Sequence, residues 1–430
     1  MIENEAPELA NSLWSATANP HPNCPPLRDA IACDIAIVGG GFTGLSCALH
    51  LAERGEKPLL LEAEAPGWGA SGRNGGQVIP GLKEDPDSIE AAFAGEAGAR
   101  MVALAGGAPD LVFDLIRRHG IDCDARRNGW IQPAHSLEAL KLSEARVEQW
   151  GRRGAPIELL DATAAESLLG CSGYHGGLLD RRGGGLHPLN YALGLAHAAQ
   201  ALGARLHGAS PVLSLEREQE RYLLKTPGGE VTARRVALCT NGYTSNLIPE
   251  LRRSVLPLRS LQVATEALPE ASRRSILPQG QVASDTRPLL SYFRLDAEGR
   301  FMIGGRGAER NASVAKRLRA LRGAAQALFP QLGAESWRYH WGGLVALTPD
   351  HYPHLHEPLP GLVAALGYNG RGVAMATAMG RVLADKLTGS ADTELDFPVT
   401  ALQPIPFHGL RRPVIAAAMA WQLLRARLNG

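Results

Sequence analysis

Six consecutive residues near the start of the chain, Gly-Gly-Gly-Phe-Thr-Gly, match the spacing G-x-G-x-x-G of a dinucleotide-binding turn. In that pattern the first glycine permits a tight turn, the second lets the backbone approach a pyrophosphate, and the third allows a helix to pack closely on a strand. The free N–H groups at the start of that helix favour phosphate. The positions expected at the cofactor are Gly39, Gly41, Phe42, Thr43 and Gly44.

An acidic residue follows at the distance that such a site requires. Glu62 comes eighteen residues after Gly44, and Ala63 follows it directly. A carboxylate at this point can accept hydrogen bonds from both ribose hydroxyls of an adenosine half, and its charge disfavours a 2′-phosphate. The loop and the acid together predict a dinucleotide site rather than an ordinary glycine turn.

Two further glycine-rich segments indicate which dinucleotide is bound. Residues 68–77 are small enough for the backbone to lie against a flat ring system. Residues 366–373 form a second strand–glycine–helix junction, which suits a helix N-terminus directed at the electron-rich edge of a flavin. Arg371 either adds positive charge there or pairs with a surface carboxylate. Because the chain has only one complete fingerprint, we expect FAD and no separate NAD(P)H site. The expected contacts are Ala70, Ser71, Arg73, Asn74, Gly75, Gly76 and Gln77 in the first segment, and Gly367, Tyr368, Asn369, Gly370, Arg371, Gly372 and Val373 in the second.

Apolar periodicity indicates the elements that carry these loops. Ile31–Val38 is typical of a buried parallel strand, Thr43–Arg54 of an amphipathic helix, and Pro58–Leu61 of a second strand, which makes a βαβ start. Further helices are expected at 87–120, 136–170, Asn190–Leu202 and Gly372–Leu387, and further strands at Gly129–Gln132, Pro211–Glu216, Arg221–Lys225, Glu230–Cys239, 255–266, 287–305 and Leu362–Leu366.

The predicted fold class is α/β, with a discontinuous Rossmann-like FAD-binding domain and an α+β substrate domain built on a mixed, largely antiparallel sheet. The expected boundaries are 1–30 for an N-terminal strap of irregular structure, 31–85, 150–245 and 340–400 for the FAD-binding domain, 86–149 and 246–339 for the substrate domain, and 401–430 for a C-terminal tail helix.

Composition excludes several classes of function. The net charge is +1 over 430 residues, so no basic excess points to nucleic acid. None of the six cysteines forms a Cys-x-x-Cys pair, and no metal site is predicted. Neither a secretory signal nor a membrane span is recognisable, so a cytoplasmic location is expected. The tail from Arg411 to Leu428 is basic and apolar, and either packs on the body as a helix or touches a membrane surface.

Three blocks of sequence resemble the D-amino-acid oxidase superfamily of FAD-dependent amine oxidoreductases. They are G-G-G-F-T-G with L-L-L-E-A-E in 35–64, G-W-G-A-S-G-R-N-G-G-Q in 67–77, and P-G-L-V-A-A-L-G-Y-N-G-R-G-V from Pro360. The second block and W-S-A-T-A-N-P-H-P at 14–22 are most similar to the γ-glutamylputrescine oxidase branch. The resemblance implies backbone contacts from Val212 to adenine and a strand ending at the cofactor with Thr240, Asn241 and Gly242.

The same resemblance implies that the FAD is held non-covalently. Monomeric sarcosine oxidase links its flavin to a cysteine before a T-P-D-like stretch, whereas here Gly343 occupies the matching place before Thr348-Pro349-Asp350. That relative also has a lysine near the ring that promotes reaction with O2, and Met302 aligns with it. The electron acceptor, O2 or another, therefore stays open.

Four residues are candidates for the catalytic, substrate-facing side: Gln77, Tyr292, Arg294 and His351. Gln77 closes the loop expected over the ring. Tyr292 and Arg294 alternate on one strand and so share a face, where Arg294 either holds a substrate carboxylate or makes a structural ion pair. His351 opens the motif His-x-x-His-x-His, which is more typical of loop histidines than of a metal site because prolines interrupt it.

The predicted activity is oxidation of an amine C–N bond, with a hydride passing to flavin N5 and the imine hydrolysing to an aldehyde. A γ-glutamyl-polyamine such as γ-glutamylputrescine is the expected substrate, with O2 as acceptor. One alternative is a D-amino acid, sarcosine or glycine oxidase or dehydrogenase. Another, from outside enzymes, is a non-catalytic flavin-binding subunit.

Overall fold

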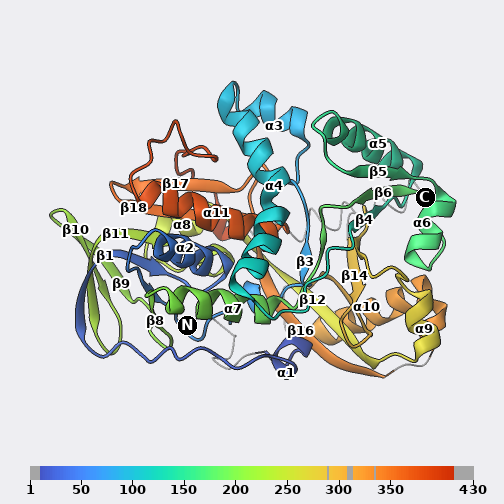
Figure 1. The fold of residues 1–430 in the computed structure, drawn as a ribbon, viewed down its shortest axis with the longest axis horizontal. Coiled ribbons are helices and arrows are strands. Elements are labelled where there is room, and N and C mark those ends of the chain that lie inside the picture. Colours follow the sequence, from blue (N-terminus) through green and yellow to red (C-terminus); the bar gives the residue numbers. More distant parts are fainter. Residues whose placement is uncertain (1–9, 288–289, 308–312, 334–335, 411–430) are drawn as a thin grey trace.

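The computed structural model describes residues 10–410 except 288–289, 308–312 and 334–335. The chain forms two large sheets that lie at opposite sides of the molecule (Figure 1). The first has the order β17-β18-β11-β1-β2-β8, and β10 and β9 extend antiparallel from β11. Its strands are β1 (Ala30–Val38), β2 (Leu59–Leu61), β8 (Arg205–His207), β9 (Ser214–Glu218), β10 (Arg221–Lys225), β11 (Glu230–Leu238), β17 (His354–Leu359) and β18 (Leu362–Leu366).

The central strands of this sheet run parallel, so their carboxyl ends meet at one edge. All five residues of β18 are buried, as expected for a strand covered on both faces. α2 packs between α11 and α7, and α11 also packs on α4, the long helix in the middle of Figure 1. These helices are α2 (Phe42–Glu53), α4 (Glu96–His119), α7 (Pro188–Ala201) and α11 (Gly372–Leu387).

The second sheet has the order β16-β12-β15-β14-β13-β4-β6-β5, and most of its pairs are antiparallel. Phe329, next to α10 (Val314–Leu328), packs edge to face against Phe293 and Phe301 in its core. Its strands are β4 (Trp130–Pro133), β5 (Ile157–Leu160), β6 (Gly177–Asp180), β12 (Leu256–Ala267), β13 (Val282–Ser284), β14 (Ser291–Leu295), β15 (Arg300–Arg306) and β16 (Trp337–Leu347). The mixed α/β fold class is confirmed.

Two of the long predicted helices are interrupted. The segment 87–120 divides into α3 (Pro86–Ala92) and α4, because Gly95 turns the chain at φ 76° between them. The segment 136–170 contains α5 (Leu137–Gly151), then β5, then α6 (Ala162–Leu169). β5 was missed because its partner β6 lies about twenty residues away along the chain, so the pairing is not encoded in local periodicity.

The chain passes from one sheet to the other at positions that differ from the expected domain boundaries. Residues 157–180, expected in the FAD-binding domain, supply β5 and β6 to the second sheet, and β16 extends that sheet from 337 to 347. Conversely, α4, expected in the substrate domain, packs on α11. The division into domains therefore stays a proposal.

The described part of the N-terminal strap, from residue 10, is mostly irregular but contains one short helix, α1 (Leu13–Ala16), whose Trp14 is buried. The predicted C-terminal tail helix lies largely outside the described residues, which end with a short turn at His408–Leu410. Among the described helices, none is long and apolar enough to cross a membrane.

Candidate functional site

A cavity of about 1970 Å³ opens where the carboxyl edge of the first sheet meets the second sheet. Most of the predicted cofactor residues line it. They are Gly39, Gly41, Phe42, Thr43, Glu62, Ala63, Ala70, Ser71, Arg73, Asn74, Gly75, Gln77, Val212, Thr240, Asn241, Gly242, Tyr368, Asn369, Gly370, Arg371, Gly372 and Val373. Of the predicted site residues, Gly44, Gly76, Gly367, Arg294 and His351 do not line this cavity, whereas Tyr292 does.

The first loop has no room for side chains. A Cβ on Gly39, which has φ 108°, would lie 2.8 Å from the Cys239 carbonyl oxygen. A Cβ on Gly44 would lie 2.0 Å from the carbonyl oxygen of Gly39, so Gly44 sets the close contact of α2 with the loop. The N–H of Phe42, in the first turn of α2, donates to Ser71 Oγ at 2.9 Å. The helix N-terminus and the second loop are thus joined at the place where a phosphate is expected.

The acid of the predicted ribose site is held in place by backbone. Glu62 accepts hydrogen bonds from the N–H groups of Gly40 and Glu64. Burial raises the pKa of Glu62, although these bonds and that of Ala63 act against it. Its carboxylate is therefore orientated at the end of β2 by contacts that leave it on the cavity wall.

The second loop is fixed from below by indole and amide groups. Trp14 Nε1 donates to the Asn74 carbonyl at 2.8 Å, and Trp341 Nε1 donates to the Arg73 carbonyl at 3.0 Å. Within the loop, Asn74 Oδ1 accepts from the N–H of Gly76 at 2.8 Å. Sequence reasoning missed both tryptophans, because they lie far from the loop along the chain.

The β18–α11 junction is tied to the neighbouring loops. The N–H of Gly367 donates to Asn241 Oδ1 at 2.9 Å, and the hydroxyls of Tyr368 and Thr43 lie 2.7 Å apart. Arg371 donates to the Pro80 carbonyl at 2.8 Å and lies 4.8 Å from the Trp130 ring centroid. Because burial lowers its pKa to about 9 and its partner is a carbonyl, the alternative of a surface ion pair for Arg371 is wrong.

Two buried amide oxygens on the cavity wall lack a partner. Gln77 donates from Nε2 to the Ala283 carbonyl at 2.9 Å, and Gln262 donates to the Arg73 carbonyl, but neither Oε1 has a hydrogen-bond partner among the residues that the structure describes. Buried acceptors of this kind cost free energy unless a ligand satisfies them. Together with the close-fitting glycine loop and Glu62, they fit a flavin dinucleotide. Gly343 lines the same wall, where it offers no sulfur for a covalent link.

Tyr292 and Arg294 share one face of β14, but only the tyrosine reaches the cavity. The Tyr292 hydroxyl lies 2.9 Å from Ser260 Oγ, and burial raises its pKa. Arg294 Nη1 donates to the Gly76 and Leu186 carbonyls at 2.8 and 2.7 Å. Arg294 therefore supports the loop from beneath and does not line this cavity, so a role for it in holding substrate stays a prediction. Met302, its neighbour on β15, is buried in the cluster around Trp14 and also lies outside the cavity.

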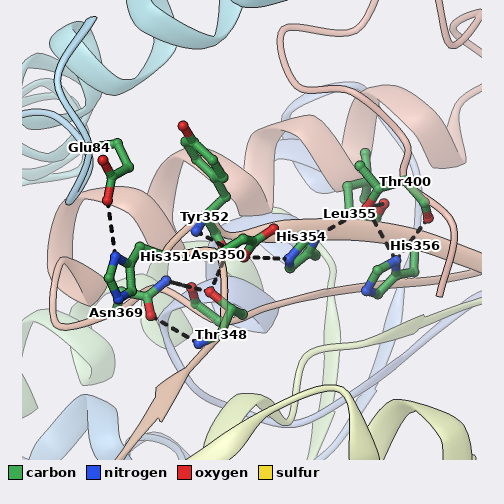
Figure 2. A network of polar contacts seen from close by, with 11 residues as sticks. Glu84, Thr348, Asp350, His351, Tyr352, His354, Leu355, His356, Asn369 and Thr400 are labelled. Carbon is green, nitrogen blue, oxygen red and sulfur yellow. Dashed lines mark hydrogen bonds and ion pairs between the residues drawn. The ribbon is translucent and has the colours of Figure 1, made fainter. Parts of the chain in front are cut away.

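His351 also lies away from the cavity. Figure 2 shows its ring turned to Glu84, with Nδ1 3.0 Å from Oε1, while His354 and His356 stack further along the same segment. His351 has φ 63° and a half-exposed side chain. Within the described ranges no group of three or more His, Cys, Asp or Glu side chains could hold a metal. The network instead ties Thr348 to Asn369 at the cavity, through a bond of 2.9 Å.

Several cavity residues were not recognised in the sequence. His135 Nδ1 lies 2.7 Å from Thr286 Oγ1, and burial followed by the charge of Arg287 lowers its pKa. Lys83 and Arg146 also line the cavity wall. No local pattern identifies these side chains, because loops and helices from different parts of the chain bring them together.

Comparison with known proteins agrees with this architecture. The family model described as DAO, FAD dependent oxidoreductase, matches residues 34–386. Gamma-glutamylputrescine oxidoreductase of Escherichia coli strain K12 is 35% identical over 431 residues, covering 98% of this chain and 99% of the relative. A probable oxidoreductase, OrdL, of Rhizobium meliloti strain 1021 is 32% identical and covers 97% of each chain.

The solved structures show the same fold. The crystal structure of glycine oxidase from Geobacillus kaustophilus superposes with a TM-score of 0.73 at 23% identity, covering 86% of this chain and 99% of the other. The family match spans both sheets and the whole cavity wall up to α11. The protein is an FAD-dependent oxidoreductase and belongs to the DAO family.

Proposed function

We propose that the protein oxidises the C–N bond of an amine, that its substrate is a γ-glutamyl-polyamine such as γ-glutamylputrescine, and that O2 accepts the electrons. The nearly full-length similarity to a gamma-glutamylputrescine oxidoreductase carries this proposal. The cavity supports it, because about 1970 Å³ is more than a single drug-sized ligand site needs. Its wall continues past the predicted cofactor residues to β4, α5 and the loop after β13.

FAD, when bound, supplies the redox chemistry by accepting a hydride equivalent from the carbon next to the amine nitrogen. The residues of this chain position the amine, because a reaction of this kind gains chiefly from orientation. Tyr292, whose hydroxyl is held by Ser260, and Gln77 line the wall near the second loop. The lowered pKa of His135 leaves a neutral imidazole at pH 7 that can accept the proton of an ammonium group. Water then hydrolyses the imine to an aldehyde and ammonia.

The decisive experiment is anaerobic absorbance spectroscopy of the purified holoenzyme with γ-glutamylputrescine, followed by admission of air. Bleaching of the flavin band and its recovery in air are expected. Bleaching without recovery would replace O2 by another acceptor, and a response only to glycine, sarcosine or D-amino acids would move the substrate to that class. If no amine or amino acid bleaches the flavin, the protein is a flavin-binding subunit rather than an amine oxidase.

A further inference from the structure

One part of the cavity wall carries an excess of positive charge. Lys83, Arg146 and Arg371 line it from the loop after β3 (Gln77–Val78), from α5 and from the start of α11. Arg371 and Arg146 each lower the pKa of Lys83, after burial, while Glu84 raises it. The three cations are therefore close enough to repel one another, which is unfavourable unless anions compensate them.

Two of the three cations already have partners. Arg146 pairs with Asp85 and donates to Gln132 Oε1 at 3.0 Å. Arg371 donates to the Pro80 carbonyl and lies over the Trp130 ring.

Lys83 is different. Its carbonyl accepts from Arg146 Nη2 at 3.2 Å, which fixes the backbone of the residue. Its ammonium, however, has no hydrogen-bond or ion-pair partner in the described part of the chain. The nearest acid along the chain, Glu84, bonds to His351 (Figure 2). Lys83, whose side chain is exposed, therefore presents an unpaired ammonium group to the cavity beside two arginines.

We propose that Lys83 binds the carboxylate of the substrate and so selects amines that carry a carboxylate at the end remote from the oxidised C–N bond. The γ-glutamyl head of the proposed substrate is such a group, so the inference rests on the proposed function. The neighbouring Arg146 and Arg371 strengthen the attraction through their charge without forming the contact. Lys83 is thus a specificity residue, distinct from the groups that face the amine.

The test compares two unreactive probes and does not depend on turnover. Glutaric acid monobutylamide has the carboxylate, amide and four-carbon chain of γ-glutamylputrescine but neither amine, and N-butylbutanamide lacks the carboxylate as well. Binding of each to the oxidised holoenzyme is measured from the shift of the flavin absorption band. In Lys83→Gln we expect the Kd of the carboxylate probe to rise about 10- to 100-fold, the range for one charged hydrogen bond. The Kd of the neutral probe stays unchanged.

Three controls make the result specific. Lys83→Arg keeps the charge and retains most of the affinity. Lys141→Gln removes an exposed lysine of α5 that does not line the cavity, and leaves both Kd values unchanged. FAD content, measured by absorbance, stays at the wild-type level in all three variants.

An unchanged Kd for the carboxylate probe in Lys83→Gln would overturn the proposal. The proposal also fails if the variant only slows reoxidation by air, because Lys83 would then act on the acceptor. If the wild type binds the carboxylate probe through Lys83 but oxidises no amine, the anion site stands and the proposed function falls.

Discussion

The glycine loops at 39–44 and 366–373 and the strand β14 all border the cavity, but they form it from different atoms. The loop at 39–44 presents backbone, and its fit is set by contacts such as the 2.0 Å that would separate a Cβ on Gly44 from the Gly39 carbonyl. β14 presents side chains, and two neighbours on the same face have different roles: Tyr292 reaches the cavity, whereas Arg294 holds the Gly76 and Leu186 carbonyls.

This difference shows which kind of binding site can be predicted from a sequence. A backbone site needs only particular residue types at fixed spacing, so its pattern is local. A side-chain site depends on which distant segments pack around it, and Arg294 bonds to carbonyls 218 and 108 residues away.

The strongest test of the backbone site is Gly44→Val. Because the clash is with a backbone oxygen that cannot move cheaply, we expect a loss of about 4 kcal/mol or more in the free energy of unfolding and no retained FAD. Thermal unfolding and flavin absorbance measure both effects. Gly107→Ala is the matched control, since a Cβ there meets nothing within 4 Å, and a mid-helix alanine should stabilise α4 by up to about 1 kcal/mol. Equal effects of the two variants would contradict the role of Gly44.

Arg294→Met tests the side-chain region. The substitution leaves two buried carbonyls without their charged donor, so we expect the free energy of unfolding to fall by about 3 to 4 kcal/mol. The KM of the folded fraction for γ-glutamylputrescine should not change, because Arg294 lies outside the cavity.

Tyr292→Phe is its control. It loses the hydroxyl contact with Ser260, worth about 1 kcal/mol, and the hydroxyl on the cavity wall, so we expect a small loss of stability with a raised KM. Denaturant unfolding and steady-state kinetics separate the two variants. A raised KM with unchanged stability in Arg294→Met would return this arginine to the substrate face.

Much of the fold and of the cofactor site could be predicted from the sequence, because both depend on local patterns. The sequence-based bounds of β10, β18 and α11 coincide with the structure, and the loops at 39–44 and 68–77 lie on the cavity wall as expected. The substrate side could not be predicted in the same way. Lys83 and His135 have no motif around them, and their chemistry arises from burial and from charges on other elements.

The support beneath the second loop should depend on pH through His187. The His187 Nδ1 accepts the N–H of Asn190 at 3.1 Å, and burial followed by the charge of Arg294 lowers its pKa to about 4. The unfolded chain, with a histidine pKa near 6.5, therefore binds a proton first as the pH falls. Stability is complete above pH 6.5 and declines as the pH falls towards 4, by up to roughly 3 kcal/mol.

Urea unfolding at several pH values measures this decline. His187→Asn keeps a residue that can cap α7 but removes the titrating group. The variant should unfold with a weaker pH dependence than the wild type over this window. Parallel curves for the two proteins would show that His187 does not titrate as expected.

His351 should show the smallest effect of all. Its side chain is half-exposed, and its contact with Glu84 is a surface pair, which contributes little to stability. His351→Gln should change the free energy of unfolding by no more than about 0.5 kcal/mol and leave kcat and KM unchanged.

His351 lies a few residues from cavity-lining Leu347, so nearness along the chain alone would place it in the site. A kcat that falls with the variant would show that the segment closes over the cavity during turnover. An unchanged kcat would agree with the position of His351 away from the cavity.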